Sequence, residues 1–361
     1  MVESLQWATD IIFTKTSEQR IGLRLQPRRV FNFSHTLSDE VANYSRVLTR
    51  NAQGDSGFLV PDWTQTQSVG AISAGSGVVI PVDLSTVDFG TQALIWESES
   101  RNEAVTITLG AGNVTADVAN TYANAQIMPL WPGSSPEGLN MSRLGAGNNN
   151  LAMGFILSES SDISASTYPQ YRGHDVLTDC PVLGGSTFDE TTAFSLSGFD
   201  NVVGNNVYLR ARDLINQVQQ MRWHVFERAS IYALRQWLHS RKGRLKAFWL
   251  SSRARDLEPV SFSGTTLTVF NDVLTRPAPF DVEVVIDGAS EYRQVTAAAS
   301  GATIDSRATV DLTLDSALTG TEIDRISMFY CVRFDSDRVD LEHAAAAGVV
   351  VQVPVREVPV P

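Results

Sequence analysis

The sequence has little of what marks secreted, membrane-spanning and metal-binding proteins. Its two cysteines, Cys180 and Cys331, lie far apart and lack metal-type spacing, which favours buried free thiols over a disulfide framework. No apolar run reaches the roughly 20 residues needed to cross a membrane. The start, MVESLQWATD, has neither the basic nor the apolar segment of a secretory signal. We therefore expect no membrane anchor, and a protein kept in the cytoplasm or released by lysis or within a larger particle.

Motifs of catalysis and cofactor binding are also missing. The five histidines are scattered singly, and none has the H-x-x-x-H or H-E-x-x-H spacing of a metal site. There is no G-x-S-x-G elbow, phosphate loop or dinucleotide fingerprint. Glycoside hydrolysis needs two carboxylates at a set separation, and nothing in the sequence singles out such a pair. We predict that the protein is not an enzyme and has no cofactor, and we name no catalytic, cofactor-binding or metal-binding residue.

Charge is unevenly distributed along the chain. The net charge of -12 argues against general binding of nucleic acid. Residues 205–256 nevertheless carry eleven Lys or Arg against three acidic residues, whereas residues 257–361 carry seven against sixteen. Complementary faces that stack between subunits and ordinary solvated surface explain this asymmetry equally well.

A strand–helix–strand pattern occurs twice in the chain. Residues 28–33 read as a strand, 38–50 as a helix and 58–63 as a strand, with Gly57 between the last two. Residues 221–226, 227–240 and 246–250 repeat this order, with Gly243 in the place of Gly57. Both helices have an apolar face with the same spacing, formed by Val41, Tyr44, Val47 and Leu48 in one and by Ile231, Leu234, Trp237 and Leu238 in the other.

Phenylalanine spacing supports this duplication. Phe58 and Phe89 are 31 residues apart, and Phe248 and Phe280 are 32 apart, with an Asp beside the later Phe in each pair. Most other segments are short alternating strands separated by Gly and Ser, which is typical of a β-sandwich or small barrel. We predict a mainly β fold with flanking α-helices (α+β), in which residues 1–165 and 166–361 form two domains. Each would hold one helix, near 38–50 and near 227–240.

Two charged clusters are the strongest candidates for a site. The basic run 241–246 would suit nucleic-acid phosphates, but it follows a helix, where the dipole favours cations, and we prefer a structural or inter-subunit role. The acidic segment 335–342 would suit a hard cation such as calcium. Its neighbours Arg333 and Arg338 favour instead a turn between two strands with local ion pairs.

Short motifs occur in order along nearly the whole chain. They are Trp7-Ala8-Thr9-Asp10, Glu18-Gln19-Arg20, Pro27-Arg28-Arg29, the FLVPDW segment 58–63, Tyr171-Arg172-Gly173, Gly243-Arg244 in GRLKAFWLSS, and Arg333-Phe334-Asp335-Ser336-Asp337. Together, and in this order, they resemble the motifs of a family of tail proteins of long-tailed bacteriophages, of the distal-tail or baseplate-hub type.

The resemblance implies a structural virion protein of the tail tip with two tail-tube-like β-sandwich or split-barrel domains. Such a protein would assemble in the host cytoplasm into a ring of three or six copies. The ring would contact the tail tube protein, the tape measure and other tail-tip proteins, and DNA would pass through it without specific binding. As interface residues we name Arg28, Arg29, Arg241, Lys242 and Arg244, with Asp335 and Asp337 as counter-charges.

Two other functions remain as alternatives. A receptor- or carbohydrate-binding module of the tail tip would show exposed Trp and Tyr side chains near one loop. Against it, Trp7, Trp63, Trp223 and Trp249 are predicted to lie within strands. A glycan hydrolase would show a pocket with two carboxylates at catalytic separation.

Overall fold

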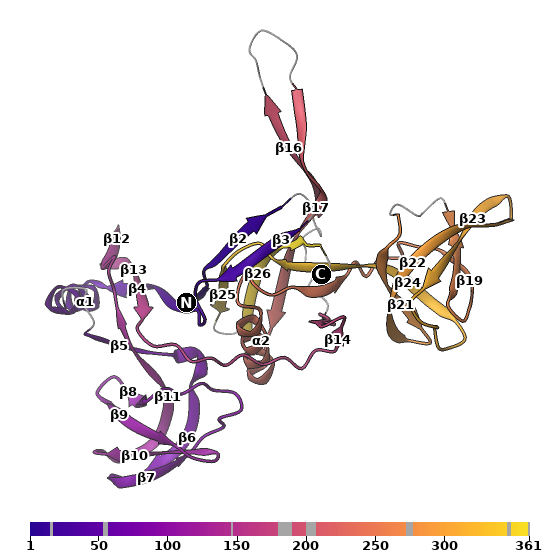
Figure 1. The fold of residues 1–361 in the computed structure, drawn as a ribbon. Helices are drawn as coiled ribbons and strands as arrows, with labels where there is room; N and C mark the ends of the chain where they lie inside the picture. Colours follow the sequence, from indigo (N-terminus) through magenta and orange to yellow (C-terminus); the bar gives the residue numbers. More distant parts are fainter. Residues whose placement is uncertain are drawn as a thin grey trace.

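The computed structural model describes residues 1–14, 17–52, 57–145, 147–179, 190–199, 207–271, 277–344 and 348–359. The fold is mainly β with flanking helices, which confirms the predicted fold class. Figure 1 shows a central body that includes α2, with a small barrel on each of two sides. Helix α1 lies at one edge, and a long hairpin of β16 and β17 projects from the central body.

The first half of the chain contains one of the two barrels and the elements around it. Its elements are β1 (Val2–Gln6), β2 (Thr9–Phe13), β3 (Glu18–Gly22), β4 (Arg28–Ser38), α1 (Asp39–Ala52), β5 (Phe58–Pro61), the 3-10 helix η1 (Trp63–Gln65), β6 (Gln67–Ile72), β7 (Gly75–Pro81), β8 (Gln92–Ser98), β9 (Arg101–Leu109), β10 (Asn113–Val118), β11 (Tyr122–Ser134), β12 (Leu139–Gly145) and β13 (Asn148–Leu157).

The second half follows the same order after a short two-stranded connection. Its elements are β14 (Gln170–Tyr171), β15 (His174–Asp175), β16 (Glu190–Phe199), β17 (Val207–Val225), α2 (Arg228–Arg241), β18 (Phe248–Ser251), β19 (Pro259–Ser263), β20 (Thr266–Phe270), β21 (Phe280–Ile286), β22 (Ala289–Ile304), β23 (Arg307–Leu314), β24 (Ile323–Phe334), β25 (Arg338–Ala344) and β26 (Gly348–Glu357).

Strand pairing is repeated in the two halves. β4 pairs with β13 and leads into α1, and β17 pairs with β26 and leads into α2. β5 pairs with β11 and β18 with β24, so that Phe58 lies opposite Gly133 and Phe248 opposite Val332. β11 then pairs with β13 through Gly133, as β24 pairs with β26 through Val332. Phe58 and Phe248 therefore occupy equivalent positions in two copies of one unit.

Each half also contains a barrel with a core of its own, formed by the strands between β5 and β11 and by those between β18 and β24. Ala93 of β8 lies opposite Pro129, and Val282 of β21 lies opposite Met328. In this register Phe280 corresponds to position 91, so the proposed equivalence of Phe89 and Phe280 is wrong by two residues. The near-equal spacing misled because the loops that enter the two barrels differ in length.

β1 joins the two halves. It pairs with β4 of its own half on one edge and with β25 of the second half on the other. One sheet therefore continues from the first half into the second through main-chain hydrogen bonds. Leu5 and Trp7 belong to the same apolar core as Trp237 and Leu238 of α2, so the first half supplies part of the core of the second.

The two helices differ in burial although their apolar faces have the same spacing. On α2, Leu238 is fully buried, and Trp237 packs edge-on against Trp223 of the sheet. On α1, Leu48 is 47% exposed and Tyr44 63% exposed. The apolar face of α1 is therefore uncovered in a single chain.

Candidate interface site at the junction of the two halves

A buried network of charged side chains lies at the junction. The Glu3 carboxylate on β1 accepts hydrogen bonds from Arg29 Nε of β4 at 3.0 Å and from Arg235 Nη2 of α2 at 2.9 Å. Arg29 Nη2 also donates to Asp62 Oδ2 at 2.9 Å, just before η1. None of these four side chains is more than 2% exposed. A buried charge is tolerated only when it is paired and hydrogen-bonded, so the network fixes the position of α2 on the first half.

Burial and neighbouring charge act in opposite directions on the pKa values of this network. Burial alone would raise the pKa of Glu3, but attraction to Arg235 and Arg29 outweighs it and holds that pKa well below its ordinary value. His239 lies on α2, as Arg235 does, and its ring packs edge-on against the ring of Trp7. Burial, together with the nearby charges of Arg235 and Arg29, lowers the pKa of His239 to about 3. His239 is therefore neutral at pH 7.

A second network connects the end of α2 with the first half. Asp337, in the turn between β24 and β25, accepts hydrogen bonds from the backbone N–H of Thr9 at 2.9 Å and its hydroxyl at 2.8 Å. It also accepts from Arg244 N at 3.0 Å and Arg244 Nε at 3.1 Å. Gly243 has a φ of +61°, and a Cβ there would come within 2.5 Å of Asp337 Oδ1. Only glycine allows this close approach.

The other predicted interface residues lie apart from these networks. Arg28 is exposed on β4, and Lys242 ends α2 in the left-handed conformation. Arg241 is buried, and its Nη2 donates to Asp175 Oδ2 at 2.7 Å. Asp335 pairs with two arginines of its own half, Arg333 at 3.2 Å and Arg356 at 2.8 Å.

The structure thus brings Arg29, Arg244 and Asp337 to the junction within one chain. A role of the seven predicted residues between subunits stays a prediction. Sequence reasoning missed Glu3, Asp62 and Arg235. Glu3 had a usable signal, because it alternates with Leu5 on one face of a strand, and an acidic residue on an apolar face requires a partner.

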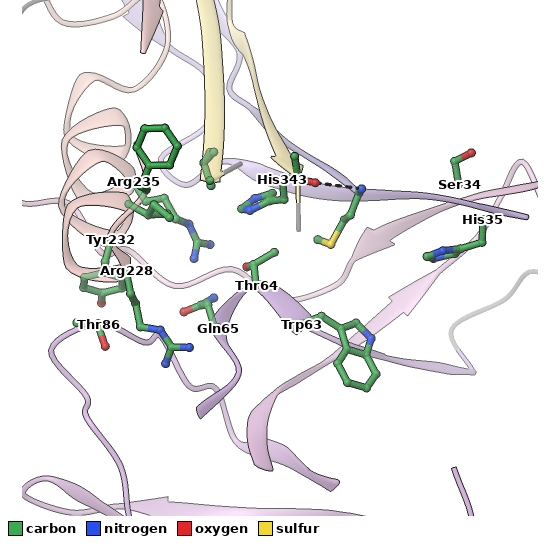
Figure 2. A pocket seen from close by; sticks show the side chains of 16 residues that line it. Ser34, His35, Trp63, Thr64, Gln65, Thr86, Arg228, Tyr232, Arg235 and His343 are labelled. Atoms are coloured by element: carbon green, nitrogen blue, oxygen red, sulfur yellow. Dashed lines mark hydrogen bonds between the residues drawn. The ribbon is translucent and has the colours of Figure 1, made fainter. Parts of the chain in front are cut away.

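A groove of about 780 Å³ opens beside the network, between η1 of the first half and α2 of the second. Figure 2 shows Trp63 and Gln65 on one side of it, and Tyr232 and Arg235 on the other. Trp63 is 41% exposed and packs edge-on against Trp96, so the prediction that Trp63 lies within a strand is wrong. It lies in the 3-10 helix because Asp62 caps that turn, accepting from Thr64 N at 3.2 Å.

The chemistry of this groove is cationic and aromatic. No Asp or Glu is among the described residues that line it, so it holds no carboxylate pair for glycoside hydrolysis. In the described ranges, no three His, Cys, Asp or Glu side chains gather as a metal site. Cys331 is a buried free thiol whose pKa is raised to about 12 by burial, and Cys180 lies outside the described residues. The groove suits a ligand with sugar or anionic groups, or a protein surface.

Comparison with models of protein families finds none that matches the chain, and comparison with curated proteins finds no relative. Of the helices in the part of the chain that the structure describes, none is long and apolar enough to cross a membrane.

Proposed function

We propose that the protein is a structural component of the virion, in the tail tip of a long-tailed bacteriophage. Copies of the chain would form a ring that connects the tail tube with the tip and surrounds the DNA conduit. Two findings support this proposal: the motifs that resemble tail-tip proteins, and a fold that contains one unit twice. The observation that carries it is the β1 junction, where one copy of the unit continues the sheet of the other through backbone hydrogen bonds.

The mechanism is geometric. A contact between unlike surfaces of neighbouring units closes into a ring when the rotation between units divides a full turn. Within the chain, the second unit already follows the first through such a contact. Three chains with six units, or six chains, would each give a closed ring. The tail tube protein, the tape measure and other tail-tip proteins are the partners of this ring.

Mass measurement and electron microscopy test this function together. The purified chain, concentrated to favour assembly, is expected to give closed rings of three or six copies with a central channel. Antibody against the chain should label the distal end of tails in the phage that encodes it. A chain that stays monomeric at all concentrations and is absent from purified virions would refute the proposal.

A second candidate function is a receptor- or carbohydrate-binding module of the tail tip, and the groove favours it. Trp63 is exposed beside Trp96 and faces a groove with Tyr232 and Arg228. Exposed aromatic rings stack on sugar faces. Binding to a glycan array that is lost in Trp63→Ala but kept in Leu59→Ala, an exposed residue of β5, would support this function.

A further inference from the structure

The repeat assigns a counterpart to both strands that form the junction between the halves. β16 occupies in the second half the place of β1, because β16 pairs with β17 as β1 pairs with β4. Glu190 lies opposite Gln219, and Glu3 lies opposite Phe31, which is the equivalent of Gln219. Glu190 is therefore the counterpart of Glu3.

In the same way, β12 occupies in the first half the place of β25. β12 forms a hairpin with β13, as β25 forms one with β26. Met141 lies opposite Leu151, and Leu341 lies opposite Val351. Met141 is the counterpart of Leu341, the residue that pairs with Glu3 across the junction.

These two counterpart strands have free edges. Within the described residues, the register pairs β12 only with β13 and β16 only with β17, whereas β1 and β25 pair with each other. The sequences LNMSRLG and ETTAFSLSGF contain no proline and one charge each, Arg143 and Glu190. Strands that remain solvent-exposed edges usually carry more charge or proline than this.

The two charged residues on the free edges, Arg143 and Glu190, have opposite charges. Their counterparts already lie close together across the junction. Across the junction, His343 Nε2 lies 3.5 Å from Glu3 Oε2, diagonal to the paired residue Leu341. The counterparts of His343 and Glu3 are Arg143 and Glu190. Pairing of the free edges in the junction's register would place Arg143 and Glu190 in that same diagonal relation.

Helix α1 gives independent support. The core that covers the apolar face of α2 includes Leu5 and Trp7, which β1 brings from the other half. The counterpart positions of Leu5 and Trp7 are Thr192 and Phe194. Among the described residues, the strand paired with β12 is β13 of its own unit, and the equivalent face of α1 is exposed.

We propose that copies of this chain join head to tail by pairing β16 of one copy with β12 of the next, antiparallel and in the register of the β1–β25 junction. Glu190 then lies opposite Met141, Thr191 opposite Asn140, and Thr192 opposite Leu139. This contact continues the central sheet from chain to chain and brings a strand to the uncovered side of α1. It rests on the proposed ring and names the surface that closes it.

Disulfide formation between engineered cysteines tests the register. In a full-length background with Cys180→Ser and Cys331→Ala, the pair Asn140→Cys and Thr191→Cys should form intermolecular disulfides on mild oxidation. Residues opposite each other in antiparallel strands have Cβ atoms about 4.5–5.5 Å apart, close to disulfide range.

The control pair Asn140→Cys and Thr192→Cys lies one residue out of register, with side chains on opposite faces. Linked multimers in the first variant and not in the second are expected. No linkage, or equal linkage, overturns the register.

Charge reversal tests the contact without new covalent bonds. Arg143→Glu and Glu190→Arg, each alone, should weaken assembly at least tenfold in the concentration required, and the double variant should restore it. Arg255→Glu, at an exposed position between β18 and β19, is the control and should assemble as the parent does. Circular dichroism confirms that each variant folds.

The outcomes separate this contact from the proposed function. If rings still form in both single charge variants, and if the Asn140→Cys and Thr191→Cys pair never forms a disulfide, the β12–β16 contact is overturned and the ring remains. A chain that remains monomeric at every concentration, with no disulfide in either pair, would overturn both.

Discussion

Glu3 shows how a single buried charge organises the junction. Its carboxylate is in contact with arginines from two elements that are more than 200 residues apart in sequence, Arg29 and Arg235. The guanidinium carbon of Arg29 also lies over the rings of Phe31 and Trp131, 5.1 Å from each ring centroid. The network therefore couples packing and charge within one cluster.

Arg29→Ala is expected to lower the free energy of unfolding by about 3–5 kcal/mol, because Glu3 and Asp62 would remain buried without that partner. Arg28→Ala, the neighbouring residue on the exposed face of β4, is the matched control and should change it by about 0.5 kcal/mol or less. Urea denaturation followed by tryptophan fluorescence measures both. Equal losses in the two variants would show that the network does not stabilise the fold.

His239 makes stability depend on pH. Its pKa is about 3 in the folded chain and near the ordinary 6.5 when unfolded. As the pH falls below 6.5, the unfolded state binds a proton that the folded state excludes, so stability decreases by up to about 1.4 kcal/mol per pH unit. Below pH 4.5 the lowered pKa of Glu3 adds to this loss, since the unfolded chain takes up a proton on this carboxylate that the folded chain still excludes.

His239→Phe should therefore flatten the pH dependence between 6.5 and 4.5 without lowering stability at pH 7. Neither ring nitrogen of His239 has a hydrogen-bond partner among the described residues, so a ring of similar size replaces it without loss of a bond. Urea midpoints at half-unit pH steps measure the effect. An unchanged slope would mean that His239 is protonated in the folded chain.

At the scale of elements, the two helices separate intrinsic helix formation from tertiary packing. Both have 14 residues, and their apolar positions match when the second is shifted by the offset that relates Phe58 to Phe248. In that alignment Leu48 corresponds to Leu238. Only α2 is covered by a sheet, because β1 lies beside that sheet within the same chain.

Leu238→Ala is expected to cost about 2–5 kcal/mol of unfolding free energy, as for a fully buried leucine. Leu48→Ala at the equivalent exposed position should cost less than about 1 kcal/mol in the monomer. The same Leu48→Ala variant should weaken assembly if α1 is covered in the ring. Thermal unfolding and sedimentation measure the two effects, and a large loss of monomer stability in Leu48→Ala would contradict the exposure of α1.

At the scale of the whole molecule, the net charge bears on the proposed role as a conduit for DNA. Several cations of the basic segment 205–256 are engaged within the chain, since Arg235, Arg241 and Arg244 pair with Glu3, Asp175 and Asp337. They contribute to the fold, and two of the carboxylates that they neutralise, Glu3 and Asp175, are buried. A conduit for DNA should not bind phosphates, and the net charge of -12 agrees with that requirement.

The assembled protein is expected not to bind duplex DNA measurably at physiological salt, with a dissociation constant weaker than about 10⁻⁴ M. Fluorescence anisotropy with a labelled duplex at 150 mM and at 50 mM salt measures this. Affinity that rises steeply at low salt, together with a positive channel surface in a map of the assembly, would contradict an acidic conduit.

The fold class and the repeated order of elements could be predicted from the amino-acid sequence. Alternating strands, two amphipathic helices and glycine breaks are local patterns, and local patterns record which face of an element is apolar. The sequence also indicated that Phe58 and Phe248 are equivalent. It failed for Phe89 and Trp63, where loop length and a capped turn decided the position.

What covers each apolar face depends on contacts between elements that are distant in the sequence. Sequence spacing gave α1 and α2 the same apolar stripe, but whether a sheet lies against it depends on strands distant in the chain. The Glu3 network escaped prediction for the same reason, because its partners come from β4, α2 and the residue before η1. Pairing between remote strands is set by register and by the closure of the whole sheet, which no local pattern encodes.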